Sequence, residues 1–142
     1  YTLDTFRKIV QEDARRRFEK YRSQFDKYFK EFNKILDTVY NLAIKHGKVT
    51  LAKKVKYYKK FIQQTEQGVL FERIFDKQLK EKLYKIEYDI EKFLSSIGET
   101  ELKKRFIQLK TIITRITYKV YGEAFGNNLH KLRAQMVYDI FK

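Results

Sequence analysis

The amino-acid sequence predicts an all-α protein: an antiparallel bundle of about four helices with a long, projecting, basic N-terminal helix. Three observations lead to this prediction. Apolar residues recur at alternating steps of four and three, the spacing of one helix face. The chain has no proline and only five glycines, so few positions interrupt a helix. No stretch shows the alternation typical of a strand, and a length of 142 residues favours one hydrophobic core.

The longest run of this spacing lies in the first third of the chain. Nine apolar residues from Ala14 to Leu42 follow one another at steps of four and three without a gap. Such a heptad pattern packs side by side with neighbouring helices. It predicts one helix from about Asp4 to Lys45, about 60 Å long at 1.5 Å per residue.

The residues before this seam follow a different pattern. Phe6, Ile9 and Val10 form an apolar face that does not continue the heptads. We therefore expect residues 1–13 to be an N-terminal arm, a helical extension, and residues 14–142 to form the bundle domain.

Glycines and capping residues mark the ends of the other predicted helices. Thr50 is a plausible N-cap of a short second helix, which we expect to end near residue 66. A third helix is predicted from Val69 to Ile97, with Gly98 as its C-cap.

The last third of the chain is predicted to hold two helices. The fourth helix begins at Glu99 or Thr100. Gly122 and Gly126 bracket a predicted loop, after which a last short helix follows Asn127 or Asn128. Short connections of this kind favour antiparallel neighbours.

Several functional classes are not expected from this composition. There is no cysteine, and the two histidines, His46 and His130, stand alone, so we expect neither a disulfide nor a metal site. No catalytic motif, cofactor loop or small-molecule site is apparent, and we expect no enzyme. No apolar run is long enough to span a bilayer. No signal-type segment opens the chain, and because it begins with Tyr1 we expect an upstream piece to have been processed or omitted.

The strong positive charge is the main functional indication. Lys and Arg exceed Asp and Glu by 32 to 18, a net charge of +14 that calls for a polyanionic partner. Residues 47–68 hold six basic residues and one acidic residue, whereas residues 69–98 are balanced. Within the first of these segments, Lys53, Lys56 and Lys60 fall opposite the apolar stripe, so we expect them to face outward and to follow phosphates.

Other cationic clusters lie on the first and fourth predicted helices. Arginine suits phosphate because its planar fork can bind two oxygens. An alternative is an ordinary solvated face, with pairs such as Glu12–Arg16 and Asp26–Lys30 along the helix. The candidate nucleic-acid-binding residues are Arg7, Lys8, Arg15, Arg16, Arg17, Lys20, Arg22, Lys27, Lys30, Lys34, Lys53, Lys56, Tyr57, Lys60, Lys103, Lys104 and Arg105.

The whole chain resembles the helical coat proteins of filamentous double-stranded DNA viruses of hyperthermophilic archaea, the rod-shaped and lipid-enveloped kinds. The resemblance rests on a basic N-terminal helix, a bundle of about four helices, a comparable length, no cysteine, and abundant Tyr and Phe. It implies two related coat subunits that wrap DNA held in A-form within a helical filament, in the virion.

We therefore expect a structural nucleoprotein subunit that packages linear double-stranded DNA through phosphate contacts, independent of sequence. Its expected partners are duplex DNA, further copies of itself and a related sibling subunit. One alternative is a cellular nucleoid-associated or RNA-binding helical protein of small oligomeric state, in the cytoplasm. Another is a peripheral binder of anionic lipid, for which the basic amphipathic helix at residues 50–66 is the argument.

Overall fold

The computed structural model describes residues 2–64 and 76–141, without the side chains of residues 63 and 64, and this part is helical throughout. The prediction of an all-α helical bundle is confirmed. In chain order the elements are α1 (Leu3–Phe18), the 3-10 turn η1 (Glu19–Tyr21), α2 (Arg22–Lys45), α3 (Val49–Gln64), α5 (Lys77–Ser96) and α6 (Thr100–Phe141).

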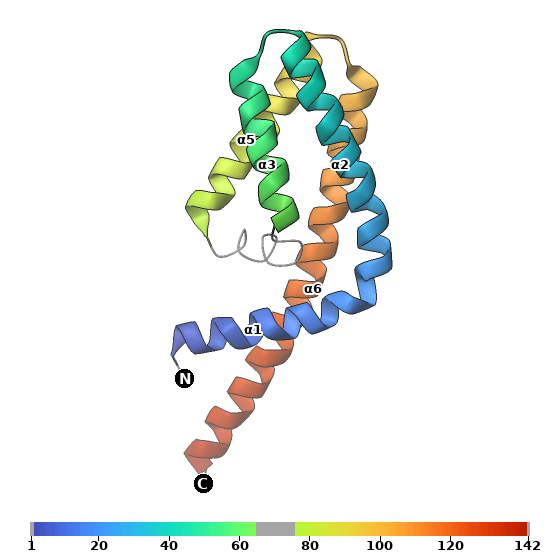
Figure 1. The fold of residues 1–142 in the computed structure, drawn as a ribbon. Coiled ribbons are helices and arrows are strands. Elements are labelled where there is room, and N and C mark those ends of the chain that lie inside the picture. Colours follow the sequence, from blue (N-terminus) through green and yellow to red (C-terminus); the bar gives the residue numbers. More distant parts are fainter. Residues whose placement is uncertain (1, 65–75, 142) are drawn as a thin grey trace.

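Four of these helices, α2, α3, α5 and α6, form the bundle. Figure 1 shows them alternating in direction, with α2 beside α3 and α6, and α5 completing the group. Each turns its apolar stripe inward. Phe32 of α2 stacks on Phe106 of α6 with ring centroids 5.3 Å apart, and it meets Tyr58 of α3 edge-on at 6.3 Å. Burial of these aromatic side chains is a major stabilising contribution.

The prediction of one continuous helix from Asp4 to Lys45 is wrong. The chain bends at η1, and α1 leaves the direction of α2 to lie across the lower half of α6 (Figure 1). Tyr21 has the non-helical angles φ −107° and ψ 0°. No glycine or proline causes the break. We attribute it to tertiary packing, because the bend brings the apolar face of α1 onto α6.

Contacts between α1 and α6 are both apolar and polar. Val10, Ala14 and Phe18 are buried, and the ring of Phe6 meets that of Phe125 at 5.8 Å. Helix α1 runs without interruption past residue 13, the predicted end of the arm. The second apolar face that was seen in Phe6 and Val10 is therefore the face that α1 turns toward α6.

The predicted loop at Gly122 and Gly126 and the separate last helix are also wrong. Helix α6 continues through both glycines to Phe141. Glycine within a helix costs only about 1 kcal/mol relative to alanine. Packing of α1 across this part of α6 offsets that cost, which a local pattern cannot show.

Gly98 takes the capping role predicted for it, and Gly47 takes the same conformation at the end of α2. Gly98 follows α5 with φ +76°, and the amide of Glu99 donates to the carbonyl of Leu94, which closes the helix end. Gly47 ends α2 in the same way with φ +71°. Helix α3 begins at Val49, one residue before the predicted cap Thr50. The predicted end near residue 66 and start at Val69 lie outside the described residues.

Candidate nucleic-acid interface

Helix α3 presents a row of lysines to solvent. Lys53, Lys56 and Lys60 are exposed, whereas Val55 and Tyr58 on the opposite side are each 1% exposed. The helix contains no acidic residue. The outward orientation that the sequence predicts for these lysines is therefore what the structure shows.

A buried hydrogen bond helps to fix the rotation of α3 about its axis. The Tyr58 hydroxyl donates to Glu87 of α5 over 2.8 Å, and the Lys110 ammonium of α6 lies 3.8 Å from the same carboxylate. Because Glu87 is only 2% exposed, losing these partners would be costly. This anchoring holds the lysine row of α3 away from the core.

Helix α2 carries a second cationic row formed by Lys27, Lys30 and Lys34, all exposed. Two carboxylates of the same helix, Glu31 and Asp37, contact basic residues of neighbouring helices. Glu31 accepts two hydrogen bonds from Arg105 of α6, at 2.7 and 2.6 Å, and Asp37 pairs with Lys59 of α3. The contact with Arg105 holds the pKa of Glu31 below its ordinary value.

Two of the three carboxylates on α2, Glu31 and Asp37, thus have their closest cationic partner on a neighbouring helix, and the third, Asp26, is exposed. The alternative pairs Glu12–Arg16 and Asp26–Lys30 are not among the ion pairs of the described residues. We define the α2–α3 face by its six exposed lysines. They are Lys27, Lys30, Lys34, Lys53, Lys56 and Lys60.

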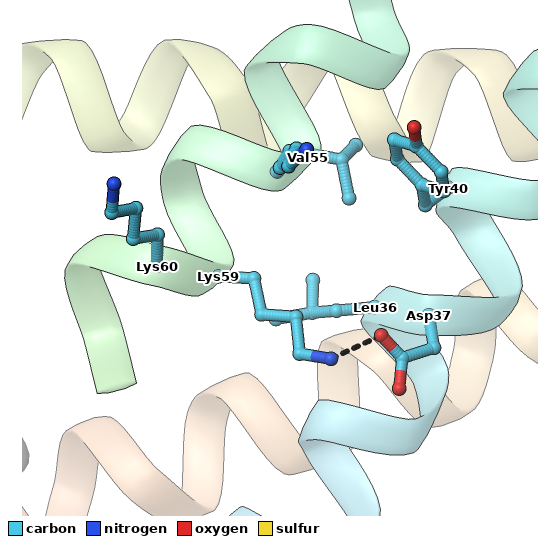
Figure 2. Close-up of a pocket in the computed structure, with 7 residues that line it drawn as sticks. Leu36, Asp37, Tyr40, Val55, Lys59 and Lys60 are labelled. Carbon is cyan, nitrogen blue, oxygen red and sulfur yellow. Dashed lines mark hydrogen bonds and ion pairs between the residues drawn. The ribbon is translucent and has the colours of Figure 1, made fainter. Parts of the chain in front are cut away.

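A groove of about 380 Å³ runs between the two helices. Leu36 of α2 and Val55 of α3 form its floor, with Tyr40 on one wall (Figure 2). The Lys59 side chain reaches across to Asp37, while Lys60 is directed away from that pair. Lys56, Lys59 and Lys60 of α3 therefore line a groove whose floor is apolar.

Other candidate residues have partners within the chain. Arg17 pairs with Asp13 at 3.1 Å, Arg22 with Glu19 at 3.0 Å, and Arg105 with Glu31. The Arg22 contact lowers the pKa of Glu19. These arginines already pair with carboxylates of the same chain, so they are not part of the candidate interface.

Two further candidates on other elements have partners as well. Lys103 donates to the Ser95 hydroxyl over 2.8 Å. The Tyr57 ring lies 4.3 Å beneath the Lys82 ammonium and stacks on Phe61 with centroids 6.1 Å apart. Tyr57 is therefore engaged with α5 and with its own helix.

The remaining candidates are dispersed. Arg7 is half-buried on α1, and the exposed cations Lys8, Arg15, Arg16, Lys20 and Lys104 lie on α1, η1 and the start of α6. The cationic residues of the predicted long first helix are divided by the bend at η1, with Arg16 and Lys20 before or at it and Lys27, Lys30 and Lys34 after it. The structure thus brings together the α2 and α3 lysines and separates the others from them.

Sequence reasoning missed Lys45 and Lys59. Lys45 is exposed and follows Lys34 by about three helical turns, so it extends the α2 row. Helical periodicity carried past Asn41 would have found it. Lys59 bridges to Asp37, a contact between helices that no local pattern reveals.

The described residues contain no group of three His, Asp or Glu side chains able to hold a metal ion. Among the helices that the structure describes, none is long and apolar enough to cross a membrane. Comparison of the chain with protein-family models, with curated proteins and with solved structures finds no match.

Proposed function

We propose that this protein is a structural nucleoprotein subunit that binds the phosphate backbone of duplex DNA through the α2–α3 face. One observation carries the proposal: six exposed lysines lie on two adjacent rigid helices, and the nearby carboxylates Glu31 and Asp37 are paired elsewhere. Ammonium groups placed in this way neutralise phosphates and release counterions.

Recognition in this proposal is independent of base sequence. Lysine on a flexible stem contacts phosphate as a point charge, and the described side chains of α2 and α3 form no exposed row of arginine, asparagine or glutamine that could read base edges. Many copies then line up along linear DNA as a helical filament, the arrangement of a virion coat. The resemblance to coat proteins of filamentous archaeal viruses supports that form, and the charge distribution supports the DNA contact.

The salt dependence of binding tests the proposal. If about six phosphates are neutralised, the logarithm of the binding constant for random-sequence duplex DNA should fall against log salt with a slope of about −5. Duplexes of different sequence should give the same slope and affinity. A slope near zero, or strong preference for one sequence, would contradict a backbone contact.

Electron microscopy tests the filament. Purified protein with linear duplex DNA should form regular filaments, whereas duplex RNA and single strands serve as comparison ligands. DNA that stays uncoated at saturating protein would contradict the coat role, and equal coating of duplex RNA would contradict a preference for DNA.

A further inference from the structure

The C-terminal end of α6 carries an apolar stripe that the chain itself covers only in part. Phe125, Leu129, Leu132, Met136 and Ile140 follow one another at steps of four, three, four and four, the spacing of one helix face. Leu129 and Leu132 are half-buried, whereas Met136 is 57% and Ile140 is 74% exposed. We call these five residues the α6 stripe.

Figure 1 shows where other helices stop covering α6. Helix α1 crosses α6 above its last turns, and beyond this crossing α6 projects from the molecule with no other described helix beside it. Val137, Tyr138 and Phe141 are more than half exposed on the same projecting end. The stripe therefore continues from a covered part, beneath α1, to an uncovered part.

A groove of about 320 Å³ lies beside the stripe, where α1 meets α6. Phe6 and Ile9 of α1 and Leu132 of α6 provide its apolar lining, and Asn128, Lys131 and Gln135 provide its polar lining. The same chain thus offers a projecting apolar helix and, next to it, an apolar groove. In a pair of copies, the projecting helix of each copy can therefore pack into the groove of the other.

The exposed stripe supplies part of the area that a specific interface needs. Met136 and Ile140 are more than half exposed and Phe125 is 40% exposed, so the stripe presents roughly 300 Å² of apolar surface in one patch. Each partner of a stable interface buries about 800 Å². The rest of that area has to come from the groove and from the surface of α1 and α6 around it.

The local charge favours another copy of the chain over a polyanion. Residues 2–12 hold two basic and two acidic side chains, and residues 129–141 hold two basic and one acidic, although the whole chain carries +14. Two copies that meet at this end bring little like charge together. A DNA phosphate would find little here to attract it.

We propose that two copies pair about a two-fold axis, each placing the end of its α6 stripe against the α1–α6 groove of the other. The inference deepens the proposed function, because it names the contact between the copies that coat one DNA. The pair forms without DNA, and the α2–α3 face stays uncovered in it. Self-association and DNA binding therefore use separate surfaces.

Mass measurement without DNA tests the pairing. Light scattering after size exclusion should give twice the chain mass of 17.4 kDa at micromolar concentration. The double variant Met136→Glu with Ile140→Glu should raise the dissociation constant at least about 100-fold, because each lost anchor costs about tenfold or more. Both side chains are exposed in the single chain, so helical content and unfolding temperature serve to verify folding.

The matched control places the same charges on the opposite face of the same helix end, as Ala134→Glu with Tyr138→Glu. This variant should still form the pair. A single-chain mass for the unaltered protein overturns the proposal, and so does pairing that survives M136E/I140E. Equal loss in both double variants would also overturn it, because the stripe would then have no special role.

Cysteine cross-linking locates the contact, since the natural chain has no cysteine. Copies carrying I9C mixed with copies carrying I140C should form a disulfide under mild oxidation, which can only join two copies. I9C mixed with Lys77→Cys, on α5, should not. Absence of the first cross-link in a protein that still pairs would overturn the proposed geometry. DNA binding by the M136E/I140E variant tests the α2–α3 face separately. The pairing can therefore fail while the proposed DNA contact holds, and the reverse.

Discussion

The α2–α3 face and the region where α1 crosses α6, here called the α1–α6 end, both combine apolar helix stripes with charged side chains. They differ in which of these groups have partners within the chain. On the α2–α3 face the apolar stripes are buried, and Glu31 and Asp37 are bound to neighbouring helices, so lysines remain available. At the α1–α6 end Arg17 is paired with Asp13, while the α6 stripe remains partly uncovered. What a surface can bind is thus decided by the groups that the fold leaves unmatched, and not by composition.

The largest expected effect comes from neutralising the α3 row. The triple variant Lys53→Gln, Lys56→Gln and Lys60→Gln should weaken duplex DNA binding roughly 10²- to 10³-fold at 0.1 M salt and reduce the salt slope by about 2.7, since three phosphate contacts are lost. Fluorescence anisotropy with a labelled duplex measures both. The self-association mass should stay unchanged.

Helix α5 offers the matched control for charge. Lys77→Gln, Lys85→Gln and Lys92→Gln remove the same three charges from exposed positions on a helix with nearly balanced charge. This variant should change affinity much less than the α3 variant. Equal losses would show that only net charge matters and would remove the distinction between the two surfaces.

A smaller effect is expected where α1 meets α6. Asp13 accepts hydrogen bonds from Asn128 at 2.7 Å and from Arg17 at 3.1 Å. Asp13→Ala leaves both donors without this acceptor and should lower the free energy of unfolding by about 1.5–3 kcal/mol. Asp26→Ala, on an exposed carboxylate, should change it by less than about 0.5 kcal/mol. Chemical denaturation measures both, and similar losses would contradict a specific role for Asp13.

Acid should weaken the same junction. Burial raises the pKa of Asp13, but the hydrogen bonds from Asn128 and Arg17 outweigh it, and the pKa lies below its usual 3.8. A carboxylate with a lowered folded-state pKa adds stability above its unfolded pKa, and this is lost as pH falls through the folded value. The unaltered protein should therefore lose more stability between pH 5 and pH 3 than Asp13→Asn. Parallel pH profiles would contradict this.

The smallest effects concern the glycines. Gly122→Ala and Gly126→Ala should each raise the free energy of unfolding by about 0.5–1 kcal/mol, because a helical alanine is favoured and the added Cβ has no atom within 4 Å. Gly98→Ala should lower it by about 1 kcal/mol, since its φ of +76° is unfavourable for alanine. Thermal unfolding distinguishes them. No gain at Gly122 and Gly126 would favour the loop predicted from the sequence.

Much of the fold could be predicted because its cause is local. The heptad spacing identified α2 and its buried residues such as Phe25 and Val39, and the acid-free stretch after Gly47 identified the lysine row of α3. Both depend on periodicity within one helix. Gly98 was predicted as a cap because its turn needs only its own φ.

The remaining features depend on contacts between distant residues. The bend at η1 has no glycine or proline to announce it, and the continuity of α6 through Gly122 depends on α1 packing there. The pairing of Arg105 with Glu31 joins residues 74 positions apart. For this reason the sequence could propose Arg105 as a phosphate ligand, whereas the fold pairs it with Glu31. Arg17 and Arg22 pair with carboxylates within one helical turn, Asp13 and Glu19, and their spacing in the sequence already allowed these pairs.

The reactivity of individual lysines toward an acylating reagent, with and without duplex DNA, tests the central claim most directly. We predict that Lys27, Lys30 and Lys34 of α2 and the three α3 lysines are protected at least about tenfold by DNA, while Lys77, Lys85 and Lys92 react as before. Uniform protection of both sets, or protection only of Lys8 on α1 and Lys20 at the bend, would contradict the account.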